Sequence, residues 1–358
     1  MTQQNLKLNA GEWVEVRPLP EILATLDERG CLDELPFMPQ MIRCCGKQFQ
    51  VRKRAHKLCD TAYSTGARSM RNAVFLEMAS CDGKAYGGCE MGCQIFWKEA
   101  WLKRTEPNAL NLPSSAVPLR AERQEQCSEA DIWAGTKKSS GGEDVFVCQA
   151  TQMLAATKPL SRWAPGQYIE DYASGNAPLS QIASGIIYVI YSNLVNSGLG
   201  FGSALRWAYD AFQRVRGGCQ YPDRFGVLAK GKGTPTAILG LETGELVRVR
   251  PFDEILETVD RDLINRGMSF HPEMVPYCNK TFRVRQRVSK IINERNGHLK
   301  VLKNPCVILE GADCIGRYTK PLNCPRACYP YWREIWLERV DGDPVPTNAP
   351  ANQTHSKT

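Results

Sequence analysis

The sequence has few histidines and none of the common catalytic motifs. Its 358 residues include only four histidines, at positions 56, 271, 298 and 355. It contains no G-x-S-x-G nucleophile elbow, no Walker loop and no H-E-x-x-H motif. The run GLGFG from Gly198 follows an expected helix rather than a strand, which argues against a dinucleotide-binding loop. The sequence therefore names no reaction, and whether the protein is an enzyme stays open.

Long apolar runs are also missing. The longest, around Ile186 to Tyr191, falls far short of the ~20 residues that a helix needs to cross a bilayer. Residues 1–10 are polar and lack the apolar stretch of a signal peptide. We therefore expect no membrane association and a cytoplasmic location.

The excess of positive charge is small. The formal net charge is +7, and the composition of 43% hydrophobic and 23% charged residues is that of an ordinary globular protein. The basic excess lies in the two ends of the chain, while the middle is nearly neutral. This balance permits nucleic acid or another acidic partner without requiring one.

Cysteine, by contrast, is abundant. The 15 cysteines would indicate a disulfide framework in a small secreted protein. In a chain of this size without a signal peptide they favour metal ligation instead.

The chain contains most of itself twice. The segment GEWVEVRPLPEILATLD from Gly11 returns as GELVRVRPFDEILETVD from Gly244. Val14 and Val247 are 233 residues apart, and the step becomes 235 for the closing segments FWKEAWLKR and YWREIWLER. Residues kept in both copies serve the shared fold or a shared site, so the two copies can be compared as an internal experiment.

Each copy has the pattern of a small β-barrel. In the first copy, Val14 and Val16 alternate with charged residues, and strands are also expected around 49–51 and 74–77. A short helix is expected to follow, carrying the two tryptophans of the closing segment. In the second copy, 288–294 is interpreted as an added turn. The opening G-E-x-V-x-V-R resembles the first strand of SH3-like barrels, including the KOW module.

The middle of the chain is expected to be helical. Helices are predicted over 149–156, 179–196 and 203–216, and a flexible loop over 137–142. The expected fold is α+β, with two SH3-like repeats flanking a helical middle domain. The predicted boundaries are 6–104 for the first repeat, 105–243 for the middle domain, with a linker over 105–118, 244–340 for the second repeat, and 341–358 for a disordered tail.

Four cysteines hold equivalent places in each copy. The last two form C-x₃-C, which places both thiolates on one side of a helical turn. This pattern predicts a tetrahedral zinc site in each copy that pins the closing helix to the barrel. Buried core thiols, disulfides and an iron–sulfur cluster are the alternatives. The predicted ligands are Cys45, Cys81, Cys89 and Cys93 in the first copy, and Cys278, Cys314, Cys324 and Cys328 in the second.

The seven other cysteines have no counterpart in the other copy. We interpret them as packing residues, with Cys44 as a possible substitute ligand beside Cys45. They are Cys31, Cys44, Cys59, Cys127, Cys148, Cys219 and Cys306.

The closing segments repeat the signature W-K/R-E-x-W-L-x-R. Trp97 and Trp101 are four residues apart and would share one face of a helix. The favoured interpretation is a buried aromatic stripe, with Glu99 and Arg104 satisfying each other or a strand end. The alternative is an aromatic and basic surface on which bases could stack.

Basic residues cluster at equivalent places in the two copies. Strand alternation would put several of them on one exposed face, as a solvated surface or as a site for a phosphate backbone. The residues are Arg52, Lys53, Arg54 and Lys57, and Arg283, Arg285, Arg287 and Lys290.

Catalytic candidates are weak and lie where the copies differ. His271 stands where the first copy has Met38, and with Glu273 it could form an acid–base pair. A loop histidine beside a glutamate is more often structural.

Several segments together carry a family resemblance. They are CQAT, GQYIEDYASGN, RWAYD, GELVRVRPFDEIL, PEMVPYC and CPRACYPYWREIWLERV. With them the chain resembles a family of hypothetical bacterial proteins from polysaccharide or natural-product biosynthesis neighbourhoods. The resemblance implies a fold and a genomic context, but no activity and no site residue.

These observations favour a zinc-stabilised, non-catalytic binding or scaffold protein with a protein partner, accessory to a bacterial biosynthetic pathway. One alternative is nucleic-acid binding through the barrels. Another is a biosynthetic enzyme with a site where the second repeat meets the middle domain, acting on a substrate that the sequence does not identify.

Overall fold

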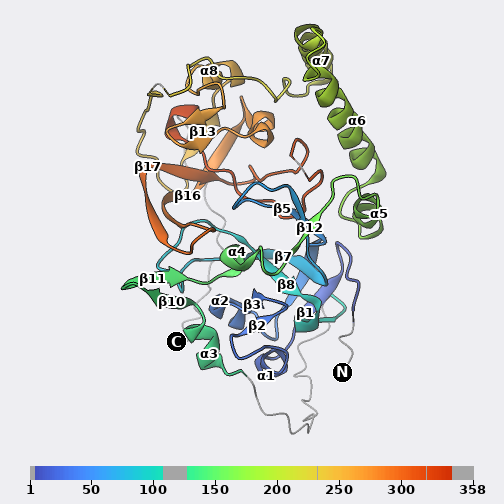
Figure 1. The fold of residues 1–358 in the computed structure, drawn as a ribbon, viewed down its shortest axis with the longest axis vertical. Coiled ribbons are helices and arrows are strands. Elements are labelled where there is room, and N and C mark those ends of the chain that lie inside the picture. The colour runs from blue at the N-terminus through green and yellow to red at the C-terminus, as the bar shows by residue number, and fades with distance from the viewer. Residues whose placement is uncertain (1–4, 108–126, 232, 320, 341–358) are drawn as a thin grey trace, which may run out of the picture.

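The protein is a mixed α+β fold made of several small antiparallel sheets (Figure 1). The computed structural model describes residues 5–107, 127–231, 233–319 and 321–340. The expected α+β class is confirmed. The predicted tail and most of the predicted linker lie outside the described residues.

The first copy is organised by a five-stranded sheet in the order β8-β7-β4-β1-β9. Val14 of β1 pairs with Phe49 on one side and with Arg104 on the other. The strands are β1 (Trp13–Val16), β4 (Gln48–Arg54), β7 (Ala73–Ser80), β8 (Gln94–Lys98) and β9 (Leu102–Arg104).

Short elements complete the first copy. They lie in the connections of the sheet and leave the strand order unchanged. They are α1 (Leu19–Leu23), β2 (Cys31–Leu32), β3 (Leu35–Pro36), α2 (Pro39–Ile42), β5 (Lys57–Cys59), β6 (Ala67–Ser69) and the 3₁₀ turn η1 (Glu99–Trp101).

The second copy repeats this arrangement with longer strands. Its sheet has the order β17-β16-β13-β18, and a bridge between Val307 and Trp332 matches the pairing of Val74 with Trp97. Its elements are β13 (Leu246–Val249), α8 (Phe252–Leu256), β14 (Ile264–Asn265), β15 (Met268–Ser269), η2 (Pro272–Tyr277), β16 (Thr281–Ile292), β17 (Leu299–Leu309), η3 (Glu334–Trp336) and β18 (Leu337–Arg339).

The middle segment divides between a part packed on the first copy and a projecting arm. Its first part contributes Ile132, Phe146 and Met153 to the core of the first copy, and β12 pairs with β6. Its elements are α3 (Glu129–Ala134), β10 (Lys137–Ser140), β11 (Glu143–Phe146), α4 (Gln149–Gln152) and β12 (Lys158–Leu160).

The projecting part is helical. It consists of α5 (Gly166–Ala173), α6 (Leu179–Val195) and α7 (Gly202–Arg216), and α6 and α7 extend past the sheets at the upper right of Figure 1. The prediction of two long helices in this region is confirmed. Among the described residues, no helix is both long and apolar enough to span a membrane.

Three local predictions were wrong. The closing helix is instead strand β8, a 3₁₀ turn and strand β9, because Phe96 and Trp97 alternate between the two faces of the sheet. The added turn over 288–294 is largely the continuation of β16. The flexible loop over 137–142 forms most of the β10–β11 hairpin.

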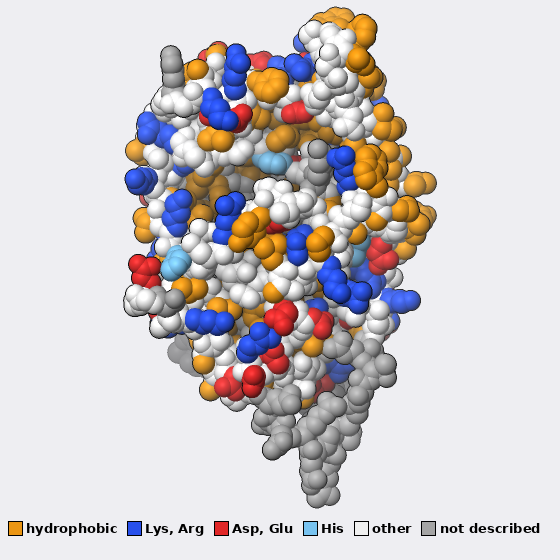
Figure 2. Space-filling view, viewed as in Figure 1, with side chains coloured by type: hydrophobic (Ala, Val, Ile, Leu, Met, Phe, Trp, Pro, Cys, Tyr) orange, Lys and Arg blue, Asp and Glu red, His pale blue; other side chains and the backbone are white. Residues whose placement is uncertain are grey.

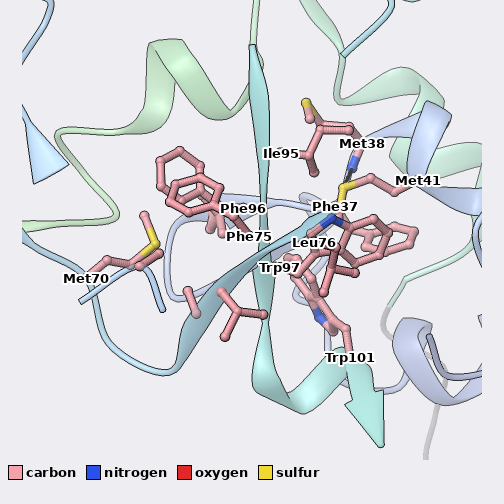
Figure 3. Packing of buried hydrophobic residues seen from close by; sticks show 14 of the residues in the cluster. Phe37, Met38, Met41, Met70, Phe75, Leu76, Ile95, Phe96, Trp97 and Trp101 are labelled. Carbon is pink, nitrogen blue, oxygen red and sulfur yellow. Dashed lines mark hydrogen bonds between the residues drawn. The ribbon is translucent and has the colours of Figure 1, made fainter. Parts of the chain in front are cut away.

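Both faces of the first sheet are apolar. Phe37 packs edge-on against Trp97 and Trp101, with ring centroids 6.3 and 5.2 Å apart. Phe75 and Phe96 pack together on the other side of the strands (Figure 3). All four tryptophans of the two closing segments are fully buried, as the buried-stripe interpretation requires.

The second tryptophan of each closing segment has the same hydrogen-bond partner in both copies, whereas Nε1 of Trp97 and of Trp332 is buried without a partner among the described residues. Trp101 Nε1 donates to Thr25 Oγ1 at 3.2 Å, and Trp336 Nε1 donates to Thr258 Oγ1 at 3.0 Å. The repeated tryptophans therefore have a structural role.

The repeated glutamates are buried, and each forms an ion pair. Glu99 pairs with Arg54 at 3.2 Å, and Glu334 pairs with Arg287 at 2.8 Å. The expected pairing of Glu99 with Arg104 is absent, because Arg104 on the exposed strand end instead meets Glu12 at 2.8 Å.

The two copies face each other around an approximate twofold axis. In such an interface, residues on the axis contact their own equivalents. Thr61 contacts Glu294 at 2.5 Å and Gln94 contacts Tyr329 at 3.2 Å, and the members of each pair are equivalent positions. The copies thus form an internal dimer.

Candidate metal centres

Each copy carries the last three of its four repeated cysteines on one closure loop. The first closure loop comprises residues 81–93, and the second comprises 314–319 and 321–328. Cys81 N donates to Cys93 O at 2.8 Å, and Cys314 N donates to Cys328 O at 2.9 Å. The two loops therefore hold their first and last cysteines in the same relation.

The cysteines of the first closure loop share one cavity with a fourth cysteine. Cys81, Cys89 and Cys93 line a small cavity of about 20 Å³ together with Cys148, which precedes α4. Burial raises the pKa of Cys81 to about 12 and that of Cys93 well above its usual value. Four cysteines thus line one small cavity.

Cys45, the fourth predicted ligand of the first copy, is not in this cavity. The charged and polarisable groups that act on its thiol are Cys44 and Glu129. The side chain that approaches the closure loop from α2 is Gln40, whose Nε2 donates to Cys81 Sγ at 3.2 Å.

The cysteines of the second closure loop meet a thiol from the first copy. Cys324 Sγ lies 3.8 Å from Cys59 Sγ. Hydrogen bonding with the Cys59 thiol lowers the pKa of both Cys324 and Cys328.

Cys278, the fourth predicted ligand of the second copy, lies elsewhere. It lines a cleft of about 360 Å³ between α7 and the second copy, together with Cys219 and Tyr318. Burial and the nearby Cys219 thiol raise the pKa of Cys278, and no cysteine of the closure loop contributes to this shift.

The two closure loops dock reciprocally on the opposite copies. Cys89 Sγ accepts a hydrogen bond from Ile292 N at 3.4 Å, while Cys324 Sγ meets Cys59. Cys89 is the equivalent of Cys324, and Ile292 is the equivalent of Cys59. The symmetry therefore breaks at one position, which holds a cysteine in one copy and an isoleucine in the other.

A buried arginine lies between the two thiol groups. Arg326 is 3% exposed and lines the first cavity, and Cys328, Glu294 and Cys93 raise its pKa. It donates to Thr61 Oγ1 at 2.8 Å and to Glu294 Oε1 at 3.3 Å. Its positive charge favours the thiolate form of the surrounding cysteines.

In the described part of the chain, no three His, Cys, Asp or Glu side chains are arranged so that they could hold a metal ion together. The donor set is nevertheless suitable for zinc, because thiolates are soft ligands and these thiols are free and buried or partly buried.

His271 and Glu273 do not face each other as an acid–base pair. His271 Nδ1 accepts from the backbone N–H of Glu273 at 3.3 Å. The Glu273 carboxylate accepts from Thr319 N at 2.9 Å and from Tyr318 N, and burial raises its pKa. Both side chains hold local backbone in place.

The expectation of an exposed basic face is wrong. None of the eight clustered basic residues is exposed, because this strand surface lies at the seam between the copies and the middle segment. Lys57 is fully buried against Asp171, Arg52 lies over the Phe75 ring, and Arg285 contacts Tyr329.

Comparisons with known proteins found no match to a family model, to a curated protein or to a solved structure.

Sequence reasoning passed over Cys59, Cys148 and Arg326. Cys59 has no cysteine at its equivalent position, and Cys148 lies in the middle segment, so the comparison of the copies interprets both as packing residues. No motif spacing in the sequence links these two cysteines to the closure loops.

Proposed function

We propose that the chain is a zinc-stabilised, non-catalytic binding or scaffold protein, accessory to a bacterial biosynthetic pathway. In this proposal each copy is an SH3-like barrel, and the α6–α7 hairpin, residues 179–216, is an arm that docks a protein partner. The genomic context comes from the family resemblance.

The strand order supports the barrel assignment. In the first copy the last strand, β9, lies beside the first, β1, and a 3₁₀ turn precedes it. An SH3-like barrel has the same order, with its last strand beside its first and a 3₁₀ turn between the last two strands.

The observation that carries the binding function is the exposed apolar surface of the arm. Helix α6 has no charged residue, and α7 has no buried residue. Hydrophobic side chains follow the outer edge of the arm at the upper right of Figure 2. The large exposed apolar residues are Leu179, Ile186, Ile187, Ile190, Leu194, Leu199, Phe201, Trp207, Phe212 and Val215. A contiguous apolar patch of this kind marks an interaction surface.

The arm is fixed to the second closure loop. Gln181 Nε2 donates to Asn323 Oδ1 at 3.1 Å, and the Tyr188 and Tyr318 rings are 4.9 Å apart. A Cβ added at Gly185 would lie 2.6 Å from the Leu322 side chain, so the helix packs closely there. Zinc at this loop would therefore order the base of the arm.

The binding test uses proteins encoded beside the gene and isothermal titration calorimetry. Ile187→Asp and Trp207→Asp should each weaken binding at least tenfold, because exposed residues of an interaction surface contribute ~2 kcal/mol or more when they are central to it. Val301→Asp is the matched control, since Val301 is equally exposed, at 71%, but lies on β17.

Two outcomes would contradict the binding proposal. Equal loss of binding in all three variants would show that the arm has no special role. A dimer of the chain alone in sedimentation experiments, dissociated by Ile187→Asp, would show that the arm serves self-association instead. The zinc part predicts about two zinc ions per chain in elemental analysis.

A further inference from the structure

Each closure loop supplies three cysteines, one fewer than a tetrahedral zinc site needs. We propose that Cys59 of the first copy completes the centre formed by Cys314, Cys324 and Cys328, and that Cys148 completes the centre formed by the first closure loop. Each zinc ion then joins its loop to a different part of the chain. This inference rests on the zinc stabilisation proposed above.

The distance between Cys59 and Cys324 fits a shared ion. With zinc–sulfur bonds of about 2.3 Å, the edges of a tetrahedral sulfur site are about 3.8 Å long. The two sulfurs are 3.8 Å apart, well beyond the ~2.05 Å of a disulfide.

The other two ligands are held near Cys324 by the backbone of the closure loop. Cys314 N is bonded to Cys328 O at 2.9 Å, and Gly316 packs against the backbone of Cys324, so the loop brings its three cysteines to the same part of the seam as Cys59. Rotation between staggered rotamers moves a sulfur by a few ångströms without moving the backbone.

The charge at the seam suits this centre. A zinc ion with four thiolates carries two negative charges, which are costly to bury without compensation. Arg326 lies two residues from both Cys324 and Cys328 and has only 4% of its side chain exposed. Its nearest carboxylate, Glu294 at 3.3 Å, leaves the guanidinium able to interact with the thiolates as well.

Independent geometry supports Cys148. The cavity of the first closure loop, about 20 Å³, admits one water-sized atom, and all four cysteines of the proposed set line it. The position that would supply a thiol by symmetry with Cys59 is Ile292, which lines the same cavity but cannot bind a metal. Cys148 therefore takes the place that the second copy leaves open.

The test measures zinc per folded chain after gel filtration, and the rate of zinc release to a chelator. Cys59→Ser and Cys148→Ser should each lose about one zinc ion or release it at least tenfold faster. The matched controls are Cys278→Ser and Cys45→Ser, which replace the repeated cysteines outside the closures and should behave as wild type. Cys306→Ser removes a fully buried thiol of the second copy, and this variant should also retain both zinc ions.

A rescue variant separates ligand loss from misfolding. Cys59→His supplies another zinc ligand and should restore the zinc content that Cys59→Ser loses. If Cys59→Ser folds poorly, the absorption of the cobalt-substituted Cys59→His protein should still report a changed sulfur count at one centre only. An unchanged cobalt spectrum would overturn the assignment of Cys59.

The outcomes also separate this inference from the proposed function. A wild-type chain without zinc would overturn the zinc stabilisation itself. A zinc-loaded wild type in which Cys45→Ser and Cys278→Ser lose metal, while Cys59→Ser and Cys148→Ser keep it, would overturn only the ligand assignment made here.

Discussion

The two copies agree in their cores and differ where they meet the rest of the chain. Phe270 lies 5.2 Å from Trp336, as Phe37 does from Trp101, and the same Trp–Thr hydrogen bond follows in each copy. The shared residues are thus those that form the core of each copy. The differing residues face the seam and the middle segment, which contacts the two copies through different parts.

Equivalent lysines illustrate the difference. Lys57 is fully buried and lies 2.5 Å from Asp171 of the middle segment. Lys290, its equivalent, is only partly buried and lies near the first closure loop. The middle segment therefore buries this lysine position in the first copy but not in the second.

The largest effect is expected at Asp171. Asp171→Ala leaves the ammonium of Lys57 buried without its carboxylate, and burial already lowers the pKa of this lysine. We expect the free energy of unfolding to fall by about 3–5 kcal/mol in urea denaturation.

Two control variants define the cause. Lys57→Met combined with Asp171→Leu should recover most of the loss, because apolar residues can replace a buried ion pair. Lys290→Met should change stability by no more than about 0.5 kcal/mol. A similar cost at Lys290 and Asp171 would mean that the copies are not asymmetric here.

The second effect concerns the glycine of each C-x-G turn. Gly83 and Gly316 both have a φ of +65°, and each approaches the backbone of the first C-x₃-C cysteine. A Cβ would lie 1.8 Å from Cys89 O at Gly83, and 2.6 Å from Cys324 N at Gly316. We expect Gly83→Ala and Gly316→Ala each to cost about 2–4 kcal/mol, from backbone strain and overlap together.

Gly46→Ala is the matched control for these turns. Gly46 has a φ of +73° with nothing within 4 Å of the added Cβ, so only backbone strain remains, about 1–2 kcal/mol. Its equivalent in the second copy is Asn279 at a φ of +63°. Denaturation midpoints that rank Gly46→Ala as the most harmful would contradict the close approach of the closure loops.

The smallest effect should be equal in both copies. Thr25→Val and Thr258→Val each remove the acceptor of a buried tryptophan N–H, at a cost of about 1–2 kcal/mol. Because the two hydrogen bonds are alike, the two losses should agree within about 0.5 kcal/mol in urea denaturation. A clear difference would show that the two hydrogen bonds differ in energy despite their similar geometry.

Much of the architecture could be predicted from local pattern. The alternation around Val14 predicted β1, and the apolar spacing from Leu179 predicted α6. The segment with Trp97 and Trp101 was predicted as a helix because spacing by four residues suits a helix face. In the structure Trp97 lies in β8 and Trp101 ends a 3₁₀ turn, and both rings pack against Phe37.

The candidate site could be predicted only in part. The comparison of the copies identified the closure cysteines, but it also selected Cys45 and Cys278, which pack against the core of their own copy. It could not select Cys59 or Cys148, because an internal repeat reveals only what both copies share.

The sequence by itself determined the duplication, the strand pattern of each copy and the three cysteines of each closure loop. These are properties of short segments and of their repetition. The tertiary structure alone decided which other groups meet those cysteines, that the basic strands are covered, and that α6 and α7 keep an apolar face exposed. Those features depend on how segments distant in the chain pack across the seam, where burial and charge pairing, rather than local propensity, select the neighbours.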